Sequence, residues 1–196
     1  MKIRCALLQA ILPVFLISVT AQAAEVAGVK LDDKMRVTAT GPELVLNGAG
    51  LRTRIMFKVY VAGLYLTDKK GSATDVLALK GPKRVLLSTL RDLSAAQLVD
   101  ALNDGMRDNS SAADLERLKP QIDALNAIML AVKETAKGST IAFDFIPDSG
   151  TLLTVNGEVK GAPIAGEDFY AAVLKIWIGE KPVEDGLKKA LLGAAQ

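Results

Sequence analysis

The chain has 196 residues, half of them hydrophobic, with one cysteine, no histidine and a formal net charge of +2. Without histidine it has no Ser-His-Asp or Cys-His relay and no histidine ligand for zinc, so any chemistry depends on carboxylates, lysine, arginine, tyrosine or backbone groups. The length suits one compact domain of roughly 100 to 200 residues.

The start of the chain has the pattern of a cleaved secretory signal peptide. A basic start and a mostly apolar run over residues 5–19 lead to the small-residue pattern Ala21-Gln22-Ala23, which predicts cleavage before the next residue. The apolar run is shorter than the ~20 residues of a membrane span, which favours cleavage over an uncleaved anchor. We expect a signal peptide at residues 1–23, one domain at residues 24–196, a periplasmic location and no stable membrane insertion after cleavage.

Signal cleavage changes the composition. It would remove Cys5 and two of the 24 basic residues but none of the 22 acidic ones, leaving no thiol and no formal net charge. The processed chain would then have no disulfide, metal thiolate or redox centre, and no cofactor is expected. A neutral exported domain also gives no electrostatic reason to expect nucleic-acid binding.

The first clear strand patterns follow Glu43, after a weakly patterned leader. Asn47-Gly48 predicts a hairpin turn, because this dipeptide is the strongest short hairpin signal. The run over residues 52–66 predicts a long strand that bends near Gly63. Alternation along this run places the odd residues on an apolar face and the even residues on a more polar face, namely Arg52, Arg54, Met56, Lys58 and Tyr60.

Helical periodicity begins after a predicted strand over residues 83–90. Ser94 and Gln97 have the spacing of a capping box. A further helical stretch begins near Ser111 and is expected to break or kink at Pro120. The apolar residues that share one face of the first helix are Leu98, Ala101, Leu102 and Met106.

The last third of the chain contains a second Asn-Gly turn signal, at Asn156-Gly157. The predicted helix over residues 168–178 is apolar nearly all round, which is typical of a helix buried between layers. The succession of strands and helices indicates an α+β fold with an antiparallel sheet. The elements predicted here are strands over residues 140–146, 151–155 and 158–160 and helices over residues 168–178 and 183–192.

Two groups of charged residues are candidate sites. By alternation Arg52, Arg54 and Lys58 share a strand face that suits a carboxylate or phosphate, although a solvated strand face explains the same spacing. On a straight strand Arg52 and Tyr60 lie roughly 26 Å apart, so they share a ligand only if the chain turns between them. The acidic residues near the end have the spacing of ordinary loop and helix-start acids; they are Asp144, Asp148, Glu158, Glu167 and Asp168.

Several stretches resemble the chalcone isomerase superfamily. Residues 48–52 read Gly-Ala-Gly-Leu-Arg, and residues 57–66 read Phe-Lys-Val-Tyr-Val-Ala-Gly-Leu-Tyr-Leu. The closing part resembles the exported bacterial branch of this superfamily, and the resemblance extends from about Glu43 to the end of the chain. Its motifs there are Asn156-Gly157, Gly166-Glu167-Asp168-Phe169, the stretch 174–179, Lys181-Pro182 and the stretch 187–193.

The resemblance implies an open-faced β-sandwich, in which helices pack on one face of an antiparallel sheet and a ligand cleft lies between them. In the plant enzymes the cleft holds an arginine, a threonine and a tyrosine that order a water, and an asparagine and a threonine or serine that bind substrate. Only the arginine is matched, by Arg52. The other four positions fall on Tyr60, near Leu98, near Gly105 and near Ile176 beside Trp177.

The resemblance therefore implies a domain without chalcone isomerase activity. A cleft that keeps one cation among apolar side chains suits a small apolar or acidic, fatty-acid-like ligand, as in the non-enzymatic plant relatives that bind fatty acids. Two alternatives remain: an intramolecular lyase or isomerase acting on an unknown substrate, or a cell-envelope protein that binds a partner and whose cleft is closed. No catalytic or metal-binding residue is predicted, and the predicted ligand-binding residues are Arg52, Tyr60, Leu98, Met106 and Trp177.

Overall fold

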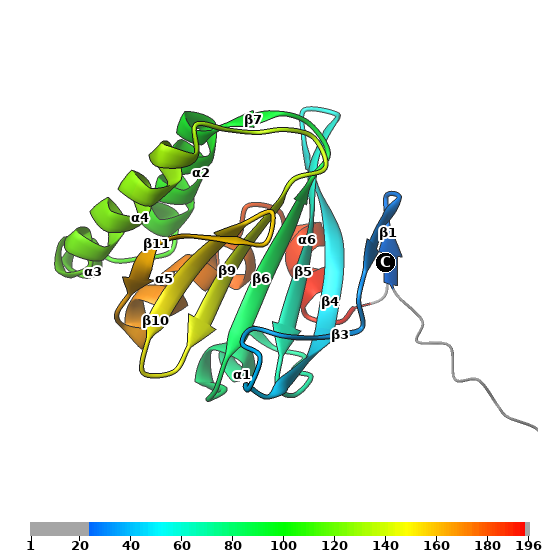
Figure 1. The fold of residues 1–196 in the computed structure, drawn as a ribbon, viewed down its shortest axis with the longest axis horizontal. Helices are drawn as coiled ribbons and strands as arrows, with labels where there is room; N and C mark the ends of the chain where they lie inside the picture. The colour runs from blue at the N-terminus through cyan, green and yellow to red at the C-terminus, as the bar shows by residue number, and fades with distance from the viewer. Residues whose placement is uncertain (1–23, 195–196) are drawn as a thin grey trace, which may run out of the picture.

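The computed structural model describes residues 24–194, which form a seven-stranded antiparallel sheet with helices on one face (Figure 1). The strand order is β11-β10-β9-β6-β5-β4-β3, and all neighbours run antiparallel. The predicted α+β open-faced sandwich is thus confirmed, whereas the signal-peptide prediction lies outside the described residues. The strands are β3 (Lys34–Arg36), β4 (Glu43–Arg54), β5 (Phe57–Leu66), β6 (Lys83–Thr89), β9 (Thr140–Ile146), β10 (Gly150–Val155) and β11 (Glu158–Ile164).

Helix α5 is the centre of the helical layer. Eight of its twelve residues are buried. The ring centroids of Trp177 and Phe143 lie 5.7 Å apart, and those of Tyr170 and Phe145 lie 5.3 Å apart, so the helix packs on β9. None of the helices among the described residues is long and apolar enough to cross a membrane. The helices are α1 (Ala73–Ala78), α2 (Ala95–Asp108), α3 (Ala112–Arg117), α4 (Lys119–Val132), α5 (Glu167–Ile178) and α6 (Asp185–Leu191).

The leader, for which the sequence predicts no structure, covers part of the other face of the sheet. Strands β1 (Ala24–Val26) and β2 (Val29–Leu31) form a hairpin, and β3 then joins the edge of the sheet beside β4. A second apolar cluster lies beneath this segment, which explains why β4 and β5 are apolar on both faces. Its buried members are Leu31, Leu44, Leu46, Val61 and Tyr65.

The predicted turn at Asn47-Gly48 is wrong, because both residues lie inside β4. Asn47 is the extra residue of a β-bulge, between the pairs Leu46–Tyr65 and Gly48–Leu64. Its buried amide donates to the carbonyl oxygens of Lys70 and Leu191, at 3.0 and 2.7 Å, and accepts from the Lys70 amide at 2.6 Å. These tertiary hydrogen bonds outweigh the local turn preference.

The long predicted strand over residues 52–66 and its bend at Gly63 are also wrong. The chain reverses at Ile55-Met56, where Arg54 pairs with Phe57, so residues 52–66 belong to two strands. Both turn residues have positive φ, +46° and +65°, as in a type I′ turn. Neither residue is typical of such a turn, which is why the sequence pattern does not reveal it.

Other local signals are confirmed. Ser94 and Gln97 form the capping box of α2, with both reciprocal hydrogen bonds present. The helical stretch after Ser111 breaks before Pro120, which lies in the first turn of α4. Asn156-Gly157 forms the turn between β10 and β11. Helix α1 and the short strands β7 (Leu93–Ser94) and β8 (Glu134–Thr135) were not predicted.

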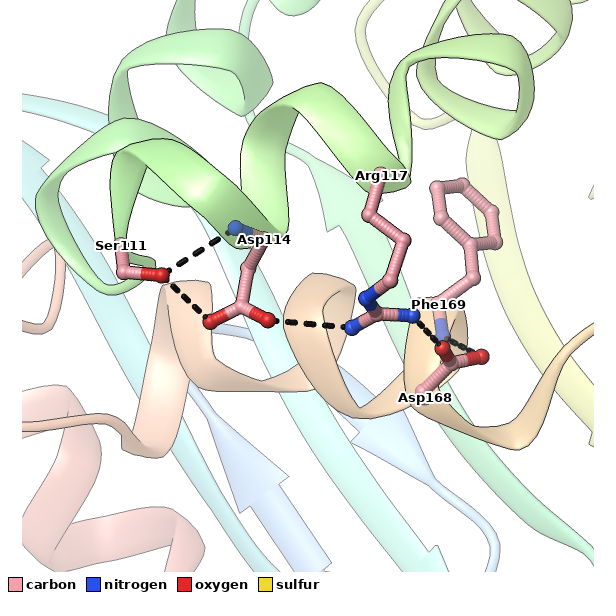
Figure 2. A network of polar contacts seen from close by, with 5 residues as sticks. All are labelled: Ser111, Asp114, Arg117, Asp168 and Phe169. Atoms are coloured by element: carbon pink, nitrogen blue, oxygen red, sulfur yellow. Dashed lines mark hydrogen bonds and ion pairs between the residues drawn. The ribbon is translucent and has the colours of Figure 1, made fainter.

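A surface network joins α3 to the start of α5. Figure 2 shows Arg117 between two carboxylates: its Nη2 donates to Asp114 Oδ1 at 3.1 Å, and its Nη1 bonds Asp168. Ser111 caps α3 by accepting from the Asp114 amide at 3.1 Å. The charged side chains are about half exposed, so each pair contributes at most about 1 kcal/mol. The network links α3 to the first turn of α5.

Candidate functional site

Arg52 and Tyr60 lie directly opposite each other on β4 and β5. The turn at Ile55-Met56 folds β5 back along β4, so the separation expected for a straight strand does not apply. Both side chains are on the face that carries the helices, because Tyr60 belongs to the main core together with Ala62 and Leu64. The condition for a shared ligand, a chain reversal between the two residues, is therefore met.

Arg52 is held by Glu184, the residue before α6. Arg52 Nη1 donates to Glu184 Oε2 at 3.0 Å and to the carbonyl oxygen of Thr53. Glu184 also accepts from the Thr53 amide at 2.8 Å and from its hydroxyl at 3.1 Å. The side chains of Arg52 and Glu184 are 22% and 28% exposed. Both of these hydrogen bonds come from Nη1, and the rest of the guanidinium lies close enough to the Tyr60 hydroxyl to help lower its pKa.

Glu184 is ionised at neutral pH. Partial burial raises its pKa, but the hydrogen bonds from Thr53 and Arg52 outweigh burial and hold the pKa below its ordinary value. The guanidinium is thus already neutralised by a carboxylate of the chain. An incoming anion would have to share Arg52 with Glu184 or displace it.

Tyr60 is buried and lines a cavity. It accepts a hydrogen bond from Trp177 Nε1 at 3.0 Å and donates none to the described residues. Burial raises the pKa of Tyr60 to about 12, although the hydrogen bond from Trp177 and the charge and hydrogen bonding of Arg52 oppose this effect. At neutral pH Tyr60 is therefore a hydrogen-bond donor and not a general base.

The cavity lies between β5, β6 and β9 of the sheet and helices α2, α4 and α5. The Tyr60 hydroxyl and the Trp177 ring nitrogen are the only polar side-chain atoms among its lining residues. It encloses about 40 Å³, which is room for a few waters, whereas ligand pockets usually enclose about 300–1,000 Å³. Its lining residues are Tyr60, Leu87, Leu98, Ala101, Leu102, Met129, Ile141, Phe143, Ile176, Trp177 and Val183.

A second apolar gap, of about 10 Å³, lies next to the cavity. The two spaces share Leu98, Met129 and Ile141 as walls. Methionine is flexible and changes rotamer readily, so movement of Met129 and Leu98 would join them. The second gap in turn shares Val132, Glu134 and Val155 with an open groove along α4 and β11. We call the cavity and the second gap together the crevice.

The structure brings together four of the five predicted ligand-binding residues. Tyr60, Leu98 and Trp177 line the cavity, and Arg52 lies beside it, opposite Tyr60. Met106 is buried about two turns beyond Leu98 on α2 and lines a separate surface hollow instead. Sequence reasoning missed Glu184, because nothing local signals a partner so distant in the chain.

The remaining charged candidates do not join this site. Arg54 and Lys58 are exposed around the β4–β5 turn, while Arg52 is partly buried. Four of the five acidic candidates are held in ion pairs: Asp144 with Arg84, Glu158 with Lys160, Glu167 with Lys80 and Asp168 with Arg117.

Comparison with known proteins establishes the family. A family model described as chalcone isomerase-like matches residues 23–193, so the chain belongs to the chalcone isomerase-like family. Among solved structures, a fatty-acid binding protein of Arabidopsis thaliana is similar, with a TM-score of 0.64 and 14% sequence identity over 84% of this chain and 92% of that chain. At this identity the likeness concerns the fold. No curated protein sequence matches the chain.

Proposed function

We propose that this chain binds a small apolar ligand with an acidic head, such as a fatty acid, in the crevice between the sheet and helices α2, α4 and α5. The observation that carries the proposal is that Tyr60 lines an otherwise apolar cavity and that Arg52 lies opposite Tyr60 on the neighbouring strand. Polar donors from Arg52 and Tyr60 beside a wall of hydrocarbon match the two parts of such a molecule.

The head of the ligand would bind between Arg52 and Tyr60. A carboxylate there accepts from Nε or Nη2 of Arg52 and from the Tyr60 hydroxyl, while Trp177 keeps that hydroxyl oriented. Hydrogen bonds between charged partners are shorter and stronger than neutral ones. The apolar tail lies along Leu98 and Met129, whose displacement joins the cavity to the second gap.

Binding without chemistry is the better account of these groups. Chalcone isomerase chemistry needs polar groups that hold the substrate and order a water, and the lining of the cavity offers only the Tyr60 hydroxyl and the Trp177 nitrogen. Tyr60 is a poor base because burial raises its pKa to about 12. The fatty-acid binding function named for the Arabidopsis protein supports the same proposal.

The proposed location is the periplasm. Its support is the signal-peptide pattern of residues 1–23, and the N-terminus of the protein isolated from its cell would test it. A protein isolated with residues 1–23 still attached would contradict the proposed export.

The decisive experiment identifies what the protein carries and then titrates that class of ligand. Native mass spectrometry of the protein from its own cell, followed by extraction, should release an apolar acid. Fatty acids of increasing length should then change the fluorescence of Trp177, the only tryptophan. Leu98→Phe, which fills the crevice, should abolish the response, whereas Leu130→Phe, at an exposed site on α4, should not.

A second candidate function follows from the small volume of the cavity. A cleft filled by its own side chains suits a partner-binding protein. If every preparation is empty and fatty acids leave the fluorescence of Trp177 unchanged, the ligand proposal is wrong and partner binding takes its place.

A further inference from the structure

The turn between β4 and β5 carries an exposed apolar apex. Ile55, Met56 and Phe57 are 80%, 96% and 63% exposed, and they are consecutive. Only two other large hydrophobic residues within residues 24–194 are comparably exposed, and these lie singly on other elements. Figure 1 shows the turn, in cyan, extending beyond the end of the neighbouring strand β6. We call residues 55–57 the apolar apex.

The apolar apex is not explained by the needs of the turn. A two-residue turn in which both residues have positive φ strongly favours Asn-Gly, and a β-branched residue such as Ile55 is unfavourable there. The chain therefore holds two large apolar side chains in water in a backbone conformation that small polar residues adopt more easily. Such a combination points to contact with something outside the chain.

Cations surround the apolar apex. Arg54 and Lys58 flank it, and the guanidinium of Arg91 lies 5.7 Å from the centre of the Phe57 ring. None of these three takes part in the ion pairs found within the described part of the chain. Nearby, the Asp92 carboxylate accepts from the Lys137 amide at 2.7 Å. Three cations against this one carboxylate make the local charge positive.

We propose that the apolar apex inserts reversibly into the surface of a lipid bilayer that contains anionic lipid. Apolar side chains with a ring of cations match an interface where hydrocarbon begins just below negative headgroups. Three side chains at the end of a hairpin offer far less area than the ~800 Å² per partner of a stable protein interface, which favours a membrane over a protein. The protein would associate with the membrane peripherally, since only a turn enters the lipid.

Docking in this way would place Arg52 and Tyr60 near the membrane. Tyr60 follows Phe57 by three residues on β5, roughly 10 Å along the strand. Transfer of an apolar acid between bilayer and crevice would then need only a short path. This link rests on the proposed function, whereas vesicle binding by the apolar apex does not require a ligand.

The test is co-sedimentation with vesicles of phosphatidylcholine, with or without phosphatidylglycerol. The wild-type protein should sediment with the anionic vesicles at low salt and be released as salt is raised. Ile55→Asn with Met56→Gly should lower binding at least about fivefold and should not lower the midpoint of thermal unfolding, because these residues suit the turn. All variants must share one N-terminus, determined by mass spectrometry, so that residues 1–23 contribute equally.

Two further variants sharpen the result. Leu130→Asn removes an exposed apolar side chain elsewhere and should bind vesicles as wild type does. Phe57→Trp should show a shift of emission to shorter wavelength on anionic vesicles. Absence of vesicle binding by wild type, or equal binding by the Asn-Gly variant, overturns the proposal. So does self-association that depends on residues 55–57 without vesicle binding, since the occupant would then be a second copy of the chain.

Discussion

Arg52 and Glu184 are 132 residues apart in the chain, and their side chains meet at 3.0 Å beside the crevice. Glu184 also accepts two hydrogen bonds from Thr53, so it is fixed to the end of β4 by three donor groups. The carboxylate therefore neutralises the charge of Arg52 and competes with an acidic ligand for the guanidinium.

The first prediction concerns this competition. Glu184→Gln keeps a hydrogen-bond acceptor but removes the negative charge, so the affinity for a fatty acid should rise about tenfold, equivalent to ~1.4 kcal/mol. Arg52→Gln should lower it by at least about tenfold. Calorimetric titration measures both, and Arg107→Gln, at an exposed pair on α2, is the control. Equal affinities for Arg52→Gln and wild type would remove Arg52 from the site.

The second prediction concerns alkaline pH. All three tyrosines are buried, and burial raises the pKa of Tyr60, Tyr65 and Tyr170. The folded protein keeps these protons when the unfolded chain loses them, so stability is complete below about pH 10 and falls as pH rises above it. With three groups the loss approaches ~4 kcal/mol per pH unit.

Tyrosinate absorbance measures this effect. Phenolate should appear only together with loss of the folded circular dichroism signal. Phenolate that forms near pH 10 in a fully folded protein would show that the tyrosines are accessible to water.

The third prediction concerns the ion pair beneath the leader. Arg84 and Asp144 are neighbours on β6 and β9, with Arg84 Nη2 donating to Asp144 Oδ2 at 2.6 Å. Asp144→Ala leaves a mostly buried guanidinium without a countercharge and should cost about 3 kcal/mol. Arg84→Met combined with Asp144→Leu should cost less than about 1 kcal/mol, because two apolar side chains replace the pair. Urea unfolding compares them, and a double variant less stable than Asp144→Ala would refute the argument.

The fourth prediction concerns the contact of α6 with β4. A Cβ atom on Gly48 would lie 2.0 Å from the carbonyl oxygen of Ala190 and 2.9 Å from that of Leu191, so α6 has to move in Gly48→Ala. We expect a loss of about 3 kcal/mol. Gly186→Ala, on α6 itself with open space around the new methyl group, should gain about 0.5 kcal/mol. If both variants unfold at the same urea concentration, the close approach at Gly48 does not limit packing.

The sequence predicts those elements whose capping and turn residues find their partners close by in the chain. Ser94 and Gln97 complete each other across one helical turn, and Asn156-Gly157 closes a hairpin between adjacent strands. The identical dipeptide Asn47-Gly48 misleads, because the Asn47 amide is bonded to Lys70 and Leu191 and because Gly48 allows the approach of α6. These contacts form only in the complete fold.

The candidate site likewise contains residues that the sequence reveals and residues that only the complete fold brings together. Arg52, Tyr60 and Trp177 are recognisable from motifs that resemble the family, and the structure brings them together. The reversal at Ile55-Met56 carries no turn residues, so alternation along residues 52–66 assigns faces to a single strand that does not exist. Glu184 is invisible for another reason: one acidic residue before a short helix looks like any helix start.

The bulge at Asn47 determines to which face of the sheet each later residue of β4 points. Before the bulge, Leu44 and Leu46 face the leader; after it, Gly48 and Arg52 face the helices, although all four positions have even numbers. If Asn47 paired with Leu64 instead, each later residue of the strand would turn over, and Arg52 would point away from the crevice. One buried amide, five residues earlier in the chain, thus decides on which side of the sheet the arginine lies.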